Sequence, residues 1–452
     1  MTLQTVTKEE LLEKAKKPSV DALKLHPFYR GKMEVVPKCC IRDFNDFAIW
    51  YTPGVAEVCR AIAKNETLVY DYTNKWNMVA VVTDGTRILG LGDIGPKAGL
   101  PVMEGKSILF KYLGGVDAVP ICLGTKDPDE IISAVKWLQP SFGAVNLEDI
   151  AQPKCFRILD TLKATSEIPV WHDDQQGTAT VVLGGLINAL EVVGKKVKDV
   201  TVTLIGAGAS NLACARLMFA YGIKPSNTIV VDSKGILHRE RKDIEMRKSE
   251  YVDKWRICQT TNAEGRTGSI SDALKDVDVC IALSTPGPDT IKKDWVAKMA
   301  NDSIVFACAN PIPEIWPWEA KEAGAKVVAT GRSDFPNQVN NSLGFPGIFR
   351  GTLDVQARAI TDEMCIAAAE ELAKCARERG ISETNIAPNM DEWKVYPREA
   401  VAVALKAQEL GLARVKLTRS QLYDQATTII KRAREMTQKS MELGYIRLPN
   451  GS

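Results

Sequence analysis

The stretch of the chain that most restricts the fold is a short apolar run, 200–205, that leads directly into the turn Gly206-Ala207-Gly208. Helix-forming residues follow from Ala209 and Ser210. This order of strand, glycine turn and helix is typical of a dinucleotide-binding fold, in which the first glycine permits a tight turn and the second lets backbone amides approach a pyrophosphate. A second apolar run ends at Asp232, where an acid that binds ribose is expected. The sequence therefore predicts a nucleotide site that includes Gly206, Gly208, Ala209, Ser210 and Asp232.

The residues around this motif leave two questions open. Asp232 favours NAD because its charge repels a 2′-phosphate, whereas Ser233 and Lys234 offer a hydroxyl and a cation to that phosphate. A solvated loop explains Ser233 and Lys234 equally well. Asn211 stands where a third glycine usually serves helix–strand packing, so we expect looser packing of the cofactor there.

Helical and strand-like segments alternate from residue 106 to residue 331, which is typical of an α/β fold with parallel strands. Before them, residues 78–93 predict a β-hairpin with Asp84-Gly85 at its turn. A loop rich in Asn, Gly and Pro, 332–352, follows the alternation. Apolar residues then recur at three- and four-residue spacing, which predicts C-terminal helices at 354–379, 397–410 and 419–443.

Composition excludes several classes of protein. Lys and Arg total 58 and Asp and Glu total 56, so the formal charge of +2 is well below the basic excess of a general nucleic-acid binder. No apolar run approaches the ~20 residues of a membrane-spanning helix. The N-terminus also lacks the apolar stretch of a signal peptide. We therefore expect a soluble cytoplasmic protein that binds neither nucleic acid nor a membrane.

The cysteine and histidine counts restrict any metal site. The 11 cysteines contain no CxxC pair, which argues against a disulfide framework and against a zinc-thiolate site. Only 3 histidines occur, too few for a histidine-rich site. Any metal ion must therefore bind mainly through carboxylates.

Acidic pairs follow two of the strand-like segments. Glu148-Asp149 ends the segment 144–149, and Asp173-Asp174 ends the segment 168–174. If these strands are neighbours in a parallel sheet, all four carboxylates meet at one edge, where their repulsion calls for a hard cation such as Mg²⁺ or Mn²⁺. Alternatively, each pair caps the following helix or faces solvent. Two pairs at equivalent places favour the metal site.

Other polar side chains are candidates for acid–base chemistry or binding. We expect a helix to begin at Lys106, where the helix dipole disfavours the ammonium and lowers the pKa of the lysine, as suits a general base. Tyr51 and Arg87 lie in the stretches YTPGVA and DGTRILG. Asn310 and Asn341 lie beside Gly and Pro turns, where amides bind a carboxylate or carboxamide or simply hold the turn. Taken singly, each of these residues also has an ordinary structural explanation.

Together these motifs resemble the malic enzyme family, in particular its small-subunit members. Several of the matching stretches are long enough to be specific to the family, and all follow its order. They are YTPGVA (51–56), VVTDGTRILGLGDIG (81–95), MEGKSILFKYLGGVDAVPI (103–121), NLEDI (146–150), HDDQQGTATVVLGGL (172–186), IGAGAS (205–210), CANPIPE (308–314) and NQVNNSLGFPGIFRG (337–351).

The resemblance implies that the chain converts L-malate to pyruvate and CO₂ while it reduces NAD(P)⁺, with Mg²⁺ or Mn²⁺ as the metal. It implies that Lys106 is the general base, that Tyr51 is the general acid and that Asp173 tunes Lys106. The run Asp232-Ser233-Lys234 looks like that of NADP-linked members, which favours NADP over NAD. The resemblance further implies the metal ligands Glu148, Asp149 and Asp174, a malate carboxylate held by Arg87, and contacts of Asn310 and Asn341 with the nicotinamide end and the substrate.

The resemblance also implies an architecture. We expect a malic-type catalytic domain over 1–166, a Rossmann-type NAD(P)-binding domain over 167–380, a C-terminal helical extension over 381–452, and a homodimer. Gln175 replaces the isoleucine common after the acidic pair, a change for which we have no physical account.

The implied reaction needs three groups. Hydride leaves C2 of malate readily only if the hydroxyl proton also leaves, which needs a base. Loss of CO₂ needs a Lewis acid at the C2 carbonyl, and the resulting enolate needs an acid at C3. Two alternatives stay open, namely a malolactic-type enzyme that keeps NAD bound and releases lactate, and a nucleotide-binding sensor without catalysis. The joint presence of Tyr51, Lys106 and the three ligands disfavours the sensor.

Overall fold

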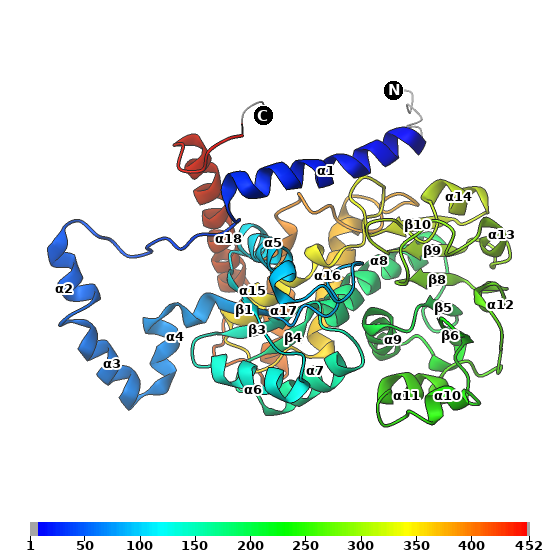
Figure 1. Ribbon diagram of the computed structural model, residues 1–452, viewed down its shortest axis with the longest axis horizontal. Coiled ribbons are helices and arrows are strands. Elements are labelled where there is room, and N and C mark those ends of the chain that lie inside the picture. Colours follow the sequence, from blue (N-terminus) through cyan, green and yellow to red (C-terminus); the bar gives the residue numbers. More distant parts are fainter. Residues whose placement is uncertain (1–7, 450–452) are drawn as a thin grey trace.

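The computed structural model describes residues 8–449, which form two sheets with helices packed around them (Figure 1). The first sheet has the strand order β2-β1-β3-β4 and the second has the order β10-β9-β8-β5-β6-β7. Neighbouring strands are parallel except β7, which is antiparallel to β6. The α/β class expected from the alternation is confirmed. The strands are β1 (Met78–Thr83), β2 (Asp117–Cys122), β3 (Ala144–Leu147), β4 (Val170–His172), β5 (Val202–Ile205), β6 (Thr228–Asp232), β7 (Gly235–Ile236), β8 (Val279–Ala282), β9 (Ile304–Ala307) and β10 (Val327–Thr330).

The strands are short runs of Val, Ile, Leu and Ala because helices cover both faces of each sheet. All residues of β3, β5, β8 and β9 are buried, so these strands have no polar face. The helices between the strands are α5 (Pro96–Gly114), α6 (Pro128–Leu138), α7 (Lys154–Thr165), α8 (Thr178–Val192), α9 (Ala209–Tyr221), α10 (Lys242–Glu245), α11 (Val252–Thr260), α12 (Ile270–Leu274), α13 (Lys293–Val296) and α14 (Pro317–Glu322).

The hairpin expected over 78–93 is wrong. β1 pairs in parallel with β2 and β3, and the chain after it is a loop closed by a bridge between Ile88 and Gly92. Gly85 has a φ of +73°, and a Cβ there would lie 2.2 Å from the backbone carbon of Gly95. The Asp-Gly pair therefore turns the chain toward the start of α5 and not into a second strand.

Two N-terminal helices differ from their expected bounds. α5 begins at Pro96, which occupies the first turn, where a missing N–H costs nothing. Lys106 therefore lies in the middle of α5 and not at its start, which corrects the expected effect of the helix dipole. α1 (Lys8–Tyr29) continues through Pro18, where the sequence predicted its end.

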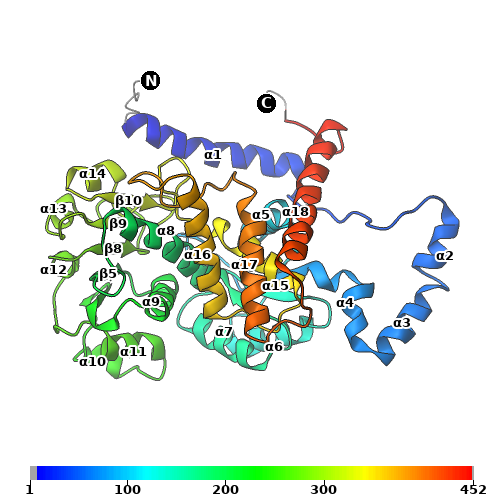
Figure 2. The same ribbon diagram turned by 180° about the vertical axis from the view of Figure 1, so that it is seen from behind.

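The C-terminal helices join the two sheets. α16 packs against α8, and α18 packs against α5, while α17 contacts both α15 and α16 (Figure 2). The three expected helices are confirmed, but the loop expected over 332–352 contains most of α15. These elements are α15 (Phe345–Asp354), α16 (Asp362–Glu378), α17 (Val395–Glu409) and α18 (Arg419–Glu442).

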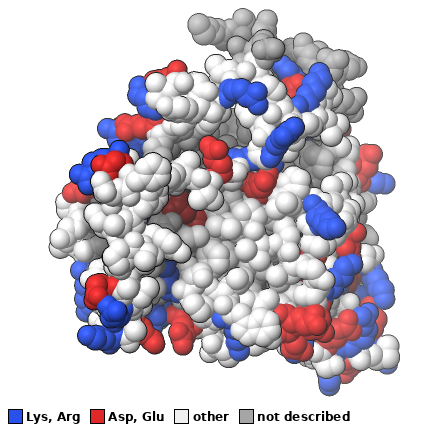
Figure 3. Space-filling model, turned by 60° about the vertical axis from the view of Figure 1, so that its left-hand side comes forward, with Lys and Arg blue, Asp and Glu red and all other residues white. Residues whose placement is uncertain are grey.

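Residues 35–72, which we call the arm, extend away from the sheets (Figures 1 and 2). The arm contains α2 (Phe47–Trp50), α3 (Val55–Lys64) and α4 (Val69–Tyr72), and Asp46 is its single buried residue. Phe44, with 90% of its surface exposed, and other large apolar side chains of the arm face solvent. Seen from the side on which the arm extends, the surface has a broad area without charged side chains (Figure 3).

Within residues 8–449, no helix combines the length and the apolar character needed to cross a bilayer.

We predict that Gly351→Ala destabilises the fold. A Cβ at Gly351, in α15, would lie 2.1 Å from the carbonyl oxygen of Ala400, in α17, so the two helices must move apart. Overpacking of this kind costs about 1–3 kcal/mol, which urea denaturation would measure as a lower free energy of unfolding. Gly105→Ala in α5 is the matched control, because a Cβ there meets nothing within 4 Å. Equal stability of the two variants would contradict the tight α15–α17 contact.

Candidate active site

The four carboxylates expected at one edge of a sheet do meet there. β3 and β4 are parallel neighbours, with Leu147 opposite His172, so the acidic pairs that follow them lie side by side. Oxygen atoms of Glu148, Asp149 and Asp174 all lie within 4.8 Å of one another. The backbone N–H of Asp149 also donates a hydrogen bond of 2.8 Å to Asp174 Oδ2. The convergence predicted from the strand ends is therefore confirmed.

These three carboxylates, which we call the acidic cluster, fit a divalent cation. Burial, followed by the charge of Asp174, raises the pKa of Asp149 to about 7, and burial also raises the pKa of Glu148. Asp149 Oδ2 is buried and has no hydrogen-bond partner in the described part of the chain. Asp149 also has a φ of +53°, a conformation that a non-glycine residue keeps only under constraint. Crowded oxygens that lack a proton donor are the ligands that Mg²⁺ and Mn²⁺ prefer.

Lys106 contacts the carboxylates from the opposite side. Its Nζ lies 2.6 Å from Asp173 Oδ2 and 2.9 Å from Glu148 Oε1, and 4.5 Å from the centre of the Phe345 ring. Burial by itself lowers the pKa of this lysine, but the charges of Asp173 and Glu148 outweigh burial and raise it.. The lowered pKa expected from a position at a helix start is therefore wrong, because Lys106 lies mid-helix between two carboxylates.

Two residues that sequence reasoning missed shape this region. A Cβ at Gly177 would lie 1.9 Å from Asp173 Oδ1, so only glycine leaves room for the carboxylate that contacts Lys106. His172 is fully buried with its Nδ1 3.6 Å from Asp174 Oδ2, and neither ring nitrogen has a hydrogen-bond partner among residues 8–449. The glycine and the histidine lie in the HDDQQG stretch, where they directly flank the acidic pair.

Of the remaining expected site residues, two lie near the acidic cluster. The backbone N–H of Arg87 donates to the carbonyl of Asp149 at 3.0 Å, and its exposed guanidinium has no partner in the described chain. Asn341 begins a short 3₁₀ turn, and its Cβ lies 3.5 Å from the position that a Cβ of Gly177 would take. Asn310 lies apart from them, with its side chain against Gly331 near the carboxyl end of β9.

Tyr51 is the expected site residue that the structure does not bring to the acidic cluster. It lies between α2 and α3 on the arm, with 72% of its surface exposed. Figure 1 shows this part of the arm away from β3 and β4.

The nucleotide motif forms the expected unit of strand, turn and helix. Gly206 has a φ of +98°, and a Cβ there would lie 2.8 Å from the carbonyl oxygen of Leu283. Gly208 caps α9, and a Cβ there would meet nothing within 4 Å, so the N-terminus of α9 is accessible. Ala209 and Ser210 are the first residues of that helix.

Asn211 does not loosen this unit. Its side chain is fully buried, and its Nδ2 donates hydrogen bonds of 2.7 and 2.8 Å to the carbonyls of Ile205 and Gly206. The amide therefore ties α9 to the end of β5, in place of the close packing that a glycine would give. The expectation of looser packing at Asn211 is wrong.

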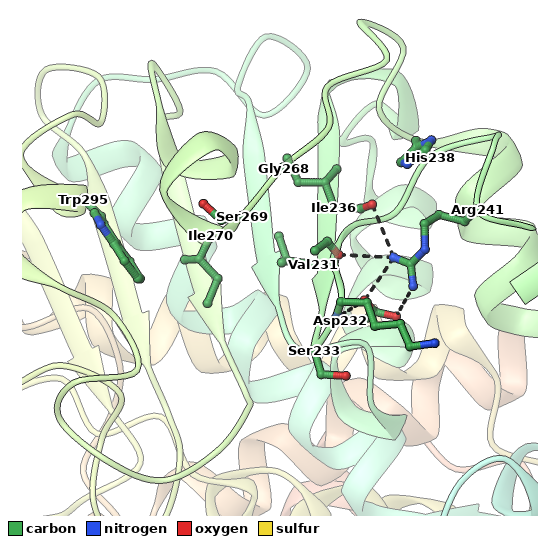
Figure 4. A pocket seen from close by; sticks show the side chains of 12 residues that line it. Val231, Asp232, Ser233, Ile236, His238, Arg241, Gly268, Ser269, Ile270 and Trp295 are labelled. Atoms are coloured by element: carbon green, nitrogen blue, oxygen red, sulfur yellow. Dashed lines mark hydrogen bonds and ion pairs between the residues drawn. The ribbon is translucent and has the colours of Figure 1, made fainter. Parts of the chain in front are cut away.

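Asp232, Ser233 and Lys234 line a cavity of about 480 Å³ at the end of β6 (Figure 4). The Asp232 carboxylate is paired with Arg241 and Lys254, two cations that sequence reasoning did not connect with it. They lie 9 and 22 residues farther along the chain, and only the fold brings them to β6.

Comparison with known proteins gives consistent matches. The family model of the malic enzyme N-terminal domain matches residues 30–163, and that of the malic enzyme NAD-binding domain matches residues 175–408. The bifunctional malic/malolactic enzyme of Bacillus subtilis is 49% identical over 396 residues, which cover 87% of this chain and 94% of that protein. The NAD-dependent malic enzyme of Geobacillus stearothermophilus is 50% identical over 384 residues, or 85% of this chain and 78% of that protein. The crystal structure of Entamoeba histolytica malic enzyme superposes with a TM-score of 0.95 at 50% identity, covering 99% of this chain and 93% of that one.

We predict that Asn211→Ala destabilises the chain, because it leaves two carbonyls at the end of β5 without their donor. The expected loss is about 1–3 kcal/mol of unfolding free energy, measured by chemical denaturation. Asn301→Ala is the control, since Asn301 is exposed and its side chain makes no hydrogen bond within the described residues. A stability of Asn211→Ala equal to that of the control would show that the amide is dispensable.

Proposed function

The chain belongs to the malic enzyme family, and we propose that it catalyses the oxidative decarboxylation of L-malate to pyruvate and CO₂ with NAD⁺ or NADP⁺ as the oxidant. The observation that carries the proposal is the contact of Lys106 with Asp173 next to the acidic cluster. A base, an acidic metal site and a nucleotide motif then lie on one chain in the arrangement that the reaction requires.

The residues of the chain divide the work of binding and proton transfer. The free guanidinium of Arg87 binds a carboxylate of malate beside the acidic cluster. Lys106 Nζ takes the proton of the C2 hydroxyl while hydride leaves C2, and Asp173, 2.6 Å away, holds that amine in place. Glu148, Asp149 and Asp174 would hold Mg²⁺ or Mn²⁺, which supplies Lewis acidity for the loss of CO₂. Asn310 and Asn341 contact the nicotinamide end of the cofactor and the substrate.

The remaining group, the general acid Tyr51, comes from a second copy of the chain. The arm that carries it exposes Phe44, Phe47, Ile49 and Trp50 to solvent, which monomeric proteins avoid over a continuous surface. A homodimer in which each arm covers its partner would bury this surface and deliver Tyr51 to the site of the partner. The isolated protomer would then hold the base without the acid.

A test of the reaction follows the absorbance of NAD(P)H at 340 nm with L-malate and Mn²⁺. We predict continuous formation of NAD(P)H by the native protein, and its loss by about 10²–10⁴-fold in Lys106→Ala, because the base is removed. The variant should bind NADPH normally, as measured by fluorescence quenching. Lys97→Ala, an exposed lysine of the same helix, is the matched control. Unchanged turnover in Lys106→Ala would sink the assignment of the base.

The same assay separates a second candidate, which the name of the Bacillus subtilis relative favours. A malolactic reaction would release lactate from malate without net accumulation of NAD(P)H. Lactate formed in place of pyruvate, at constant absorbance, would therefore replace the proposed reaction. EDTA should stop either reaction if the acidic cluster holds the metal.

Mixing two inactive variants tests whether Tyr51 acts across the dimer. We predict that Tyr51→Phe and Lys106→Ala, unfolded and refolded together, recover roughly a quarter of native activity, because half of the dimers are mixed and each mixed dimer has one intact site. Each variant refolded alone should stay inactive. If the mixture also stays inactive while gel filtration shows mixed dimers, Tyr51 serves its own protomer.

A further inference from the structure

The carboxylate of Asp232 is fully occupied by protein groups. Its Oδ1 accepts hydrogen bonds from Arg241 Nη1 at 3.0 Å and from the backbone N–H of Lys234 at 2.9 Å. Its Oδ2 lies 3.0 Å from Arg241 Nη2 and 2.7 Å from Lys254 Nζ. Only 8% of the side-chain surface of Asp232 is exposed. Since a carboxylate oxygen accepts about two hydrogen bonds, neither oxygen has capacity left for a ligand.

This occupation changes what Asp232 can do for a nucleotide. An acid at the end of the second strand selects NAD when it is free to accept the ribose 2′-hydroxyl. Here the acid is an anchor that holds Arg241 and Lys254 at the end of β6. Burial by itself raises the pKa of Asp232, but Arg241 and Lys254 outweigh burial and keep the pKa below its ordinary value, so the carboxylate stays charged and the anchor holds.

The charges around the cavity favour an anion. Three cations, Arg241, Lys254 and Lys234, face two carboxylates, Asp232 and Asp243, so the group carries one net positive charge. Lys234 Nζ lies 3.1 Å from Asp243 Oδ2 with 68% of its side-chain surface exposed, so it is free to turn toward a ligand. The repulsion of a 2′-phosphate by Asp232 is therefore cancelled by its own partners.

The shape of the cavity matches the adenosine end of a nucleotide. Ile270 and Trp295 lie on one side of it, and Arg241 and Asp232 lie on the other (Figure 4). An adenine ring has an aromatic and an aliphatic side chain to pack against, and a phosphate on its ribose faces the cations and the hydroxyl of Ser233.

We propose that Arg241 and Lys254 determine selectivity for NADP over NAD, and that Ser233 and Lys234 contact the 2′-phosphate beside them. The proposal rests on the proposed function, because it names the oxidant for the same reaction. It adds Arg241 and Lys254 as the residues that convert an NAD-type acid into part of a phosphate site.

Calorimetric titration of the full chain tests the proposal without malate or metal. The probes are AMP and adenosine 2′,5′-bisphosphate, which differ only in the 2′-phosphate. We expect the bisphosphate to bind at least about tenfold more tightly, because charge-assisted hydrogen bonds form only with that phosphate. Fluorescence titration should show the same preference for NADPH over NADH. Equal affinities of the two probes would overturn the proposal.

Two variants assign the preference to these residues. Lys254→Gln and Lys234→Gln should each lower the affinity for the bisphosphate by about tenfold and leave the affinity for AMP unchanged. Lys198→Gln is the matched control, since this exposed lysine lies before β5, at the opposite edge of the same sheet. A loss of affinity for both probes alike in Lys254→Gln would show a merely structural role for Lys254, which overturns its assignment. Because these titrations do not depend on turnover, their failure is distinguishable from a failure of malate oxidation.

Discussion

The contact of Lys106 with Asp173 and Glu148 is the interaction on which the site depends. It places a cation from α5 against carboxylates that follow β3 and β4, so it links the helix layer of the first sheet to the sheet edge. All three side chains are almost fully buried, and removal of the lysine would leave two carboxylates without compensation in a medium of low polarity. The surrounding fold is organised to hold them, with Gly177 making room for Asp173 and Phe345 packed under the ammonium.

Crowding of the acids is a cost that the fold bears for function. Three carboxylates share a few ångströms at the end of two strands, and Asp149 adopts a left-handed backbone conformation to reach the group. Structures retain such strain where the surroundings over-determine it, most often at sites that bind or react. A bound cation offsets the repulsion, so the stability of this edge and its occupancy by metal are coupled.

Much of the fold and of the acidic cluster could be predicted from the sequence because the deciding signals are local. A strand followed by a glycine turn specifies the nucleotide unit, and acids at the ends of Ala144–Leu147 and Val170–His172 must meet if those strands are neighbours. Signals that conflict locally misled the sequence analysis. Asp84-Gly85 is typical of a hairpin turn, yet both faces of β1 are covered, so its partners come from distant segments.

The remaining features could not be read from the sequence because they arise from contacts between distant parts of the chain. The pairing of Asp232 with Lys254 joins residues on β6 and α11, and the position of Lys106 depends on where α5 begins. The exposure of Tyr51 depends on the absence of contacts along the arm, which no pattern of residues encodes.

The packing of α18 against α5 has a consequence for the order of events during synthesis. Ile429, in α18, lies against Gly115, where a Cβ would come within 2.5 Å of its Cγ2, so the last helix closes on the end of the helix that carries Lys106. The ribosome makes α18 last, and domains fold as their segments emerge. The lysine therefore reaches its final setting only when translation is nearly complete, and a nascent chain that stalls earlier carries the acids of the site without a settled base.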